Sequence, residues 1–431
     1  MIYHLFEYLQ QLDIPGARLM NYLSFRAMLA SVTAMLISLI VGKKLIDFLR
    51  VKQIGETIRD LGLEGQLQKK GTPTMGGVII ILAILISALL FCNLRNIYAL
   101  LLIITTVWCG AMGFTDDYIK VFKHNKEGMS ERMKLVLQIA LGFVIGLTVC
   151  YSPDIVVREK VADTSVYISQ ESTDVNVNSE RVITSGRYKT EDVVKSTKTT
   201  IPFVKDHEFD YKVLSPFKGK WGWYTKWAIY VLMIILVITA CSNGANLTDG
   251  MDGLSAGTSA IVGVVIGILA WLSGNLIDSN YLNIMFIPGT GEVAIFMSAF
   301  VGALIGFLWY NSYPAQVFMG DTGSLTIGGI IGVSAILIRK ELLLPILCGI
   351  FLVESLSVLL QRGYFKYTRK KYGEGRRIFK MSPLHHHYQK EGIPALIKNP
   401  VHAIPEAKIV ARFWIVGIIL AVATLALLKL R

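Results

Sequence analysis

Two adjacent acids, Asp116 and Asp117, close a long apolar stretch and are followed by Lys120. Carboxylates at the end of an apolar helix are costly unless they bind a cation or face water. Adjacent acids beside a lysine suit Mg²⁺, which takes one or two carboxylates together with oxygens of substrate phosphates. A solvated loop with ordinary charges is the competing interpretation of this motif taken alone.

A second acidic segment, 243–253, lies between two further apolar stretches and holds Asn246, Asp249 and Asp252. Asp249 and Asp252 are three residues apart, so on a helical turn they share a face. The glycines of the segment let its backbone come close to a ligand. A plain solvated turn is the alternative, but it would not need this density of side-chain oxygens.

A third acid, Asp321, begins another apolar stretch after the polar segment 311–320. It could act only as a helix N-cap, which is a strong competing explanation. Helix N-termini also attract phosphates, but an aspartate there would repel them unless a cation lies between. An acid at this position therefore fits a metal site better than a bare phosphate site.

Three consecutive histidines, His385, His386 and His387, lie in the last long polar loop. They cannot all face one way on a helix, and no second Cys/His cluster completes a zinc site. Phosphate binding or acid–base chemistry is favoured, because histidine titrates near neutral pH. The alternative is a solvated polar loop.

The segment 69–77 precedes an apolar stretch and includes Lys70 and Thr74. Alone it is a weak signal, a loop with turn residues and a basic pair. Beside the other four segments it would supply cations and hydroxyls suited to phosphates.

A single acid, Glu354, lies within an apolar stretch rather than at its end. An ionisable residue inside a membrane span is a functional candidate by default. The sequence does not name its partner.

The composition places the elements that carry these residues in a membrane. Of 431 residues, 53% are hydrophobic and 17% are charged, whereas a soluble domain carries about 25% charged residues. The net charge of +12 could suit nucleic acid, but the apolar runs favour a membrane with anionic headgroups, so no nucleic-acid partner is expected. The five cysteines are scattered without CxxC spacing, so neither a disulfide framework nor a zinc site is indicated.

Ten stretches approach the roughly 20 apolar residues that a spanning helix needs. The sequence therefore predicts an all-α polytopic membrane protein with about ten transmembrane helices. The stretches are 23–48, 74–93, 96–114, 133–151, 226–242, 254–273, 292–310, 323–339, 342–364 and 409–429.

The short loops give the orientation, because cytoplasmic loops are enriched in lysine and arginine. Basic residues collect in the segments 43–70, 120–134 and 362–380, while the opposite short loops hold few. The basic loops are therefore assigned to the cytoplasm, and with ten spans both termini face outward. All five motifs then fall on the cytoplasmic side.

One polar segment, 152–224, divides the chain into transmembrane parts 1–151 and 225–431. It lies on the outer side, and alternation such as that of 166–168 predicts short β-strands. We interpret it as a surface elaboration away from the chemistry.

Five motifs on one side imply a single site with several carboxylates, Mg²⁺, basic groups and histidines. That combination suits phosphoryl transfer, in which the metal neutralises and positions the phosphates. A substrate reached from both cytosol and lipid would explain a site at the membrane boundary.

At these residues the sequence resembles the polyprenyl-phosphate N-acetylhexosamine-1-phosphate transferases. TPTMGG at 72–77 and the triple histidine favour the phospho-N-acetylmuramoyl-pentapeptide transferases among them. The insertion 152–224 departs from the family's usual shorter outer loop. The matching stretches, in the family's order, are TPTMGG at 72–77, DDYIK at 116–120, NLTDGMDGL at 246–254, WYNSYPAQVFMGDTGSL at 309–325 and PLHHHYQKEG at 383–392.

The resemblance implies transfer of phospho-MurNAc-pentapeptide from UDP-MurNAc-pentapeptide to undecaprenyl phosphate, with lipid I and UMP as products. It implies Mg²⁺ as cofactor, a bacterial inner-membrane location with the site facing the cytoplasm, and a homodimer as a possible assembly. In one mechanism Asp116 deprotonates undecaprenyl phosphate, which attacks the β-phosphate directly. In the other, an aspartate such as Asp117 attacks first. We favour direct attack with Asp116 orienting the acceptor, because phosphate monoesters titrate near neutral pH and gain little from a base.

The resemblance also implies roles for individual residues. Asp116 and Asp117 match the essential acidic pair, Asp321 the Mg²⁺-binding acid, and His385 is the leading candidate for contact with the diphosphate. The remaining matches are Asn246, Asp249 and Asp252 in the nucleotide pocket, Asn311 and Phe318 near the uridine and the metal-bearing loop, Lys70, Thr74, Lys120 and Lys134 along the cleft, and His386 and His387 in the histidine motif.

Two other functions remain open from the sequence. One is a related transferase that uses UDP-GlcNAc, which an assay of UMP release with each sugar nucleotide separates. The other is a cation-coupled transporter, since intramembrane acids also mark ion paths. A transporter predicts acids near mid-span and often an inverted repeat, whereas here the acids collect at helix ends and no repeat is evident.

Overall fold

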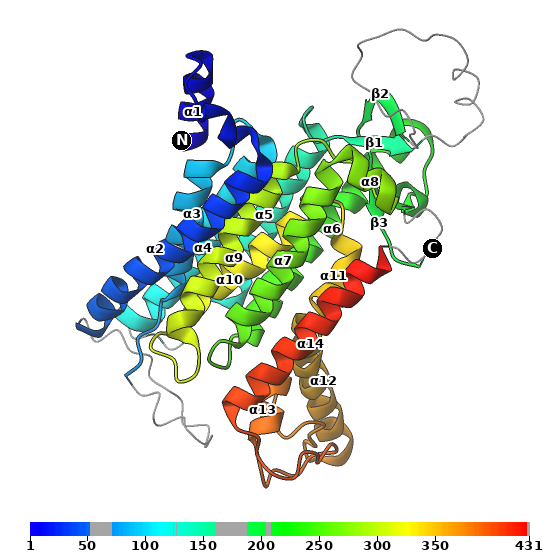
Figure 1. Cartoon of the computed structure of the whole chain (residues 1–431). Helices are drawn as coiled ribbons and strands as arrows, with labels where there is room; N and C mark the ends of the chain where they lie inside the picture. The colour runs from blue at the N-terminus through cyan, green and yellow to red at the C-terminus, as the bar shows by residue number, and fades with distance from the viewer. Residues whose placement is uncertain (52–70, 124, 126, 161–187, 204–207, 429–431) are drawn as a thin grey trace.

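The described part of the chain is a bundle of long helices with two small sheets at one end (Figure 1). The computed structural model describes residues 1–51, 71–123, 125, 127–160, 188–203 and 208–428. Its helices are α1 (Ile2–Gln11), η1 (Ala17–Asn21), α2 (Leu23–Val51), α3 (Gly77–Phe91), α4 (Ile97–Phe122), α5 (Glu131–Tyr151), η6 (Tyr211–Leu214), α6 (Gly219–Thr248), α7 (Leu254–Gly274), α8 (Leu276–Leu282), α9 (Gly291–Asn311), α10 (Gly320–Leu337), η7 (Glu341–Leu343), α11 (Leu344–Leu347), α12 (Gly349–Tyr372), α13 (Leu384–Gln389) and α14 (Glu406–Leu427).

All ten apolar stretches predicted from the sequence lie in helices, and the chain is a multi-pass membrane protein. Within the described residues, eight helices are long and apolar enough to cross a membrane, and the bent pair α11–α12 raises this to nine. The stretch 74–93 corresponds to α3, which has 15 residues. Ten crossings and two outward-facing termini therefore stay predictions.

The ninth stretch, 342–364, was expected as one continuous span, and this expectation is wrong. The helix breaks at Cys348, whose backbone ψ is 29°, and α12 leaves at 77° to the segment before it. Gly349 follows the break, where an added Cβ would lie 2.9 Å from Leu420 of α14. The missing side chain therefore leaves room for α14 at the bend.

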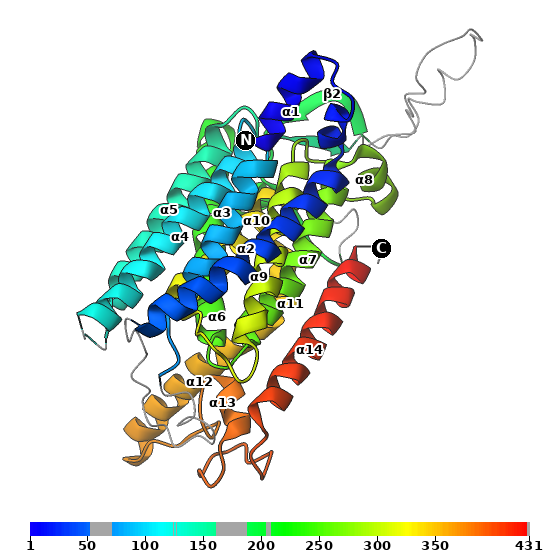
Figure 2. The same ribbon diagram turned by 60° about the vertical axis from the view of Figure 1, so that its left-hand side comes forward.

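Helix α10 lies at the centre of the bundle, with 89% of its apolar window buried (Figure 2). It packs against α3, α4, α6 and α7. In a membrane, small residues allow helices to approach closely and gain van der Waals contact. A Cβ on Gly77 would lie 2.1 Å from the backbone nitrogen of Gly323, and one on Gly302 would lie 2.1 Å from the Ser31 carbonyl oxygen. Glycine is therefore required where α3 meets α10 and where α9 meets α2.

The described part of the insertion 152–224 contains short strands, as predicted. Strand β1 (Val157–Lys160) pairs antiparallel with β2 (Tyr188–Val194), and β3 (Lys198–Thr200) pairs antiparallel with β4 (Glu208–Asp210). The alternation at 166–168 lies outside the described residues. Figure 1 places the strands at the end of the bundle opposite α12 and α13.

Replacing Gly302 with alanine is expected to lower the midpoint of thermal unfolding in detergent. The added methyl group meets the backbone of α2, and overpacking of this kind costs about 1–3 kcal/mol. Gly363→Ala is the matched control, because this exposed glycine of α12 has no atom within 4 Å of an added Cβ. That variant should be neutral or slightly stabilising. Equal midpoints for both variants would contradict the close α2–α9 contact.

Candidate active site

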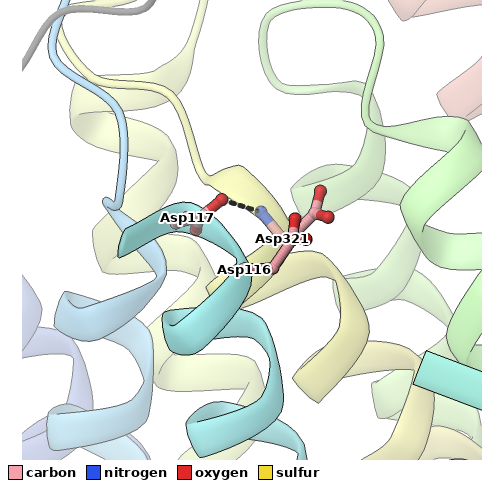
Figure 3. A group of neighbouring side chains, drawn as sticks. All are labelled: Asp116, Asp117 and Asp321. Carbon is pink, nitrogen blue, oxygen red and sulfur yellow. Dashed lines mark hydrogen bonds between the residues drawn. The ribbon is translucent and has the colours of Figure 1, made fainter. Parts of the chain in front are cut away.

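The three acids singled out at helix ends lie together in the structure. Asp116 and Asp117 come from the last turns of α4, and Asp321 comes from the first turn of α10 (Figure 3). One carboxylate oxygen from each lies within 4.8 Å of the others. Gly113, one turn before Asp117, makes this possible, since a Cβ there would lie 2.3 Å from the Asp321 carbonyl oxygen.

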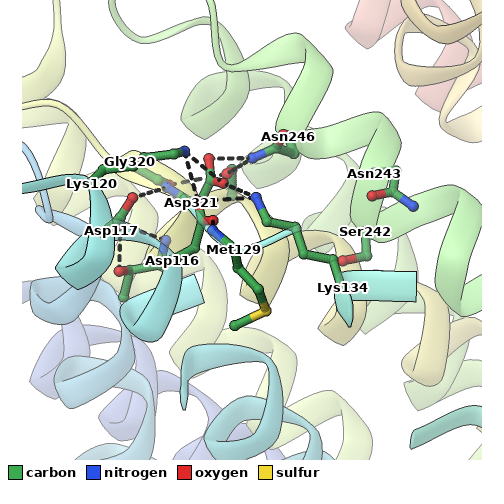
Figure 4. Close-up of polar contacts among 12 residues, drawn as sticks. Asp116, Asp117, Lys120, Met129, Lys134, Ser242, Asn243, Asn246, Gly320 and Asp321 are labelled. Atoms are coloured by element: carbon green, nitrogen blue, oxygen red, sulfur yellow. Dashed lines mark hydrogen bonds and ion pairs between the residues drawn. The ribbon is translucent and has the colours of Figure 1, made fainter. Parts of the chain in front are cut away.

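Two lysines neutralise part of this negative charge. The Lys120 Nζ lies 2.6 Å from Asp116 Oδ2 and 3.1 Å from Asp321 Oδ2. The Lys134 Nζ, from α5, lies 3.0 Å and 2.6 Å from the same two oxygens (Figure 4). Each ammonium thus bridges α4 and α10, and the five charges leave a net charge of one negative unit.

Asp117 has a different set of partners, all at the start of α10. Its Oδ1 accepts from the Asp321 backbone N–H at 3.1 Å, and its Oδ2 accepts from the Thr322 N–H at 2.9 Å and the Thr322 hydroxyl at 2.6 Å. The first N–H groups of a helix lack partners within it and carry partial positive charge. The Asp117 carboxylate therefore caps α10 from a neighbouring helix.

The solvent-facing edge of the cluster differs from its buried side. The Asp116 side chain is fully buried, whereas those of Lys120, Lys134 and Asp321 are 35%, 18% and 16% exposed. Asp116 also accepts from the backbone N–H of Met129 at 2.6 Å. A solute arriving from water therefore meets the two ammoniums and Asp321 first.

Helix α6 reaches the cluster through Asn246. Its Nδ2 donates to Asp321 Oδ1 at 2.8 Å and to the Ser324 hydroxyl at 2.9 Å. One turn earlier on α6, the Asn243 side chain exchanges two hydrogen bonds with Gln138 of α5, at 3.1 and 3.3 Å.

The sequence interpretation did not name Gln138. The signal was present, since an amide inside the apolar stretch 133–151 requires a polar partner. Gln138 follows Lys134 by one helical turn, and it also donates to the Ser242 hydroxyl at 3.1 Å. It therefore fixes α5 against α6 beside the acid cluster.

The remaining acidic segment joins the same end of the bundle. Asp252 Oδ2 accepts from the Ala315 N–H at 3.0 Å, and Asn311 Oδ1 accepts from the Gly253 N–H at 3.1 Å. The Asn311 amide also donates to the Val317 carbonyl at 2.9 Å. Asn311 is 3% exposed, and through these two hydrogen bonds its side chain joins the segment after α9 to the turn after α6. Asp249, at the end of α6, is half-buried.

The segment 72–77 lies beside the loop that leads into α10. Phe318 donates its N–H to the Pro73 carbonyl and accepts at its own carbonyl from the Gly76 N–H, both at 2.8 Å. Thr74 is buried there, at 6% exposure. Lys70 lies outside the described residues.

The three histidines have unequal surroundings. His385 is fully buried beside Glu354. His387 accepts the Lys380 N–H at Nδ1 and pairs through Nε2 with the Asn399 carbonyl at 2.7 Å, so both ring nitrogens have partners inside the loop. Burial lowers the pKa of His387. His386 is the only one of the three that is not buried, and its Nδ1 lies 2.9 Å from Gln389 Oε1.

All five motifs are thus brought together at one end of the bundle, apart from the part of 69–77 outside the described residues. The acid cluster offers only carboxylate oxygens and carries net negative charge, which fits a hard divalent cation. Both oxygens of Asp117 already accept hydrogen bonds. A cation would therefore take Asp321 and Asp116 oxygens, in competition with the two ammoniums.

The fold and the site define a polytopic membrane protein with an acidic, lysine-lined cluster at one end of its bundle. Residues 194–339 match the model of glycosyl transferase family 4, and residues 69–81 match phospho-N-acetylmuramoyl-pentapeptide-transferase signature 1. Similar chains named phospho-N-acetylmuramoyl-pentapeptide-transferase come from Parabacteroides distasonis, Porphyromonas gingivalis and Flavobacterium psychrophilum, at 59%, 55% and 54% identity over 100% of both chains. The chain belongs to the phospho-N-acetylmuramoyl-pentapeptide-transferase family.

These alignments also bear on the insertion 152–224. They extend over 432–434 residues and cover both chains completely. The insertion therefore has a counterpart of similar length in these relatives, so it does not separate the chain from them.

Removing one ammonium from the cluster is expected to strengthen binding of a divalent cation. Lys134→Gln should lower the Kd for Mn²⁺, measured by electron paramagnetic resonance without nucleotide, by about tenfold or more, because the ammonium and the cation compete for the same carboxylate oxygens. Lys123→Gln is the control, since Lys123 is exposed at the end of α4. Unchanged or weaker Mn²⁺ binding in Lys134→Gln would contradict this competition.

Proposed function

We propose that this protein transfers phospho-MurNAc-pentapeptide from UDP-MurNAc-pentapeptide to undecaprenyl phosphate, forming lipid I and releasing UMP. The observation that carries the proposal is identity above 50% over the whole chain to proteins named for this reaction. The acid cluster supports it, because oxygen-only ligands with adjacent ammoniums suit diphosphate chemistry.

The proposal includes Mg²⁺ as the cofactor and Asp321 as its principal ligand. Asp321 is the most exposed of the three acids and belongs to the first turn of α10. When bound, Mg²⁺ would neutralise charge on the diphosphate and favour departure of UMP. Asp116 is proposed as a second ligand, because a cation can replace the ammoniums of Lys120 and Lys134 that pair with it.

Direct displacement fits the surroundings of the acids best. An oxygen of undecaprenyl phosphate attacks the β-phosphorus of the donor, a new P–O–P linkage forms, and the bond to the α-phosphate oxygen breaks as UMP leaves with that electron pair. Lys120 and Lys134 lie at the exposed edge, where ammoniums can contact the phosphates of both substrates. The buried Asp116 holds these lysines, and through them orients the acceptor.

Asp117 is a poor candidate for a covalent nucleophile. Its two oxygens accept three hydrogen bonds from the start of α10, and the residue is 3% exposed. Attack through either oxygen would remove the cap from α10. We therefore assign Asp117 the role of fixing Asp321 in place.

The site also fits two substrates that come from different phases. The cluster lies where membrane-spanning helices end, so a lipid phosphate and a soluble nucleotide can meet there. This end is proposed to face the cytoplasm at a bacterial inner membrane, an orientation that the lysine- and arginine-rich loops support. Asn246, Asp249 and Asp252 are proposed to hold the nucleotide, with Thr74, Asn311, Phe318 and His386 as neighbours in the pocket. A homodimer is the proposed assembly.

Purified protein in detergent should release UMP from UDP-MurNAc-pentapeptide only when undecaprenyl phosphate and Mg²⁺ are present. EDTA should abolish the release, and UDP-GlcNAc should not replace the donor. Asp321→Asn should lower kcat by about 100-fold or more, as expected for loss of an electrostatic group at the reacting phosphates, while Asp13→Asn, an exposed acid far from the cluster, should not.

Preferred turnover of UDP-GlcNAc would support the related transferase instead. Full UMP release by folded Asp321→Asn would contradict the assigned metal ligand. Loss of UMP release in that folded variant would argue against a transporter.

No covalent intermediate is expected when the donor is supplied without the lipid acceptor. Incubation with UDP-MurNAc-pentapeptide and Mg²⁺, followed by acid quench and intact-mass measurement, should give the unmodified mass. A phosphosugar adduct that maps to Asp117, and that is absent from Asp117→Asn, would refute direct displacement and establish the two-step mechanism.

A further inference from the structure

Glu354 and His385 are fully buried ionisable groups in contact with each other, and the proposed mechanism uses neither. Glu354 lies on α12, just after the break at Cys348, and His385 lies in the first turn of α13. Both glutamate oxygens accept from the His385 backbone N–H, at 3.2 and 3.4 Å. The His385 Nδ1 lies 3.2 Å from Glu354 Oε2. One carboxylate thus accepts from the His385 backbone N–H and lies against the ring.

The opposite side of the ring packs against the acidic segment at the end of α6. A Cβ built on Gly250 would lie 2.2 Å from His385 Nε2 and 2.8 Å from its Cε1. The imidazole therefore contacts the bare backbone of Gly250, which lies between Asp249 and Asp252. Both ring nitrogens are buried, and among the described residues neither has a hydrogen-bond partner.

We propose that Glu354 and His385 form a positioning pair that fixes the turn 249–252 and thereby sets the affinity for the uridine nucleotide. The inference rests on the proposed function, because it takes Asp249 and Asp252 to be part of the nucleotide pocket. His385 acts from beneath the pocket backbone rather than on the diphosphate, which the sequence had favoured. Glu354 acts only through His385.

The contact also gives Gly250 a specific requirement. Its backbone is not in the left-handed region that demands glycine, since Gly250 is absent from the positive-φ residues. Alanine is therefore compatible with the local backbone, and the three atoms nearest to its methyl group would all belong to the imidazole. Substitution at 250 consequently tests the contact without breaking a turn.

Glu354→Gln, His385→Asn and Gly250→Ala are each expected to raise the KM for UDP-MurNAc-pentapeptide and the Kd for UMP by about tenfold to a hundredfold, the usual cost of losing a group that orients a binding residue. The kcat and the KM for undecaprenyl phosphate should change by less than about threefold. Ser357→Ala is the matched control, because its hydroxyl lies on the same helix and, among the described residues, donates to the Glu354 backbone carbonyl alone, at 2.7 Å.

Two double variants test whether the residues act through one another. Residues in one network are non-additive, so Glu354→Gln should add less than about threefold to His385→Asn. Gly250→Ala should also cost less than about threefold in His385→Asn, since the shorter side chain no longer meets the new methyl group. Thermal unfolding in detergent checks that each variant is folded. If the substitution at the buried Glu354 or His385 prevents folding, Gly250→Ala still tests the contact.

The possible failures are distinguishable. A wild-type protein that neither binds UMP nor releases it would refute the proposed function. If the wild type does both, the proposed function stands. Variant effects that are additive, or that fall on kcat at constant KM, would then overturn only the positioning pair. If the effects fall on kcat at constant KM, His385 would act on the reacting phosphates.

Discussion

Three carboxylates within 4.8 Å at the end of a membrane bundle repel one another, and the surrounding structure compensates each in its own way. Asp116 is held by two ammoniums and one backbone N–H. Asp117 is held by the positive end of α10. Asp321 shares the ammoniums and accepts from Asn246. The partners come from α4, α5, α6 and α10, so a movement of any of these helices would break contacts that compensate the negative charge.

This balance requires very close helix contacts, and glycine supplies them at two positions. Gly113 lets α4 reach the Asp321 backbone. Gly320 has φ +72°, a conformation that side chains rarely adopt, and a Cβ there would lie 2.6 Å from Asp117 Oδ2. The cap on α10 therefore depends on two residues without side chains as much as on the carboxylate itself.

The sequence could predict the helices and the meeting of the motifs, because both follow from one-dimensional patterns. Apolar length gave the membrane helices, and basic loops put the acids Asp116, Asp249 and Asp321 on one side. Neither pattern reports how deeply a polar side chain is buried. The burial of His385 and the partner of Glu354 therefore appeared only in three dimensions.

The break at Cys348 was missed for a related reason. A hydropathy pattern does not distinguish one straight span from two helices joined at 77°, since the apolar residues continue through the bend. Gln138 was missed although its signal was readable, because an amide in an apolar stretch names no partner. Its partner Asn243 lies on another helix, 105 positions away.

Helix α10 is fixed at both ends, and this connects the insertion with the acid cluster. At its start, Asp117 accepts three hydrogen bonds. Just beyond its other end, the Arg339 carbonyl accepts from the Thr200 N–H of β3 at 3.0 Å, and the buried Lys340 donates to the Thr200 hydroxyl at 2.7 Å. A helix held at both ends cannot slide along its axis, so Asp321 keeps its distance from the lysines. The insertion, which the sequence suggested was remote from the chemistry, thus helps to fix the position of the acid on which the proposed chemistry depends.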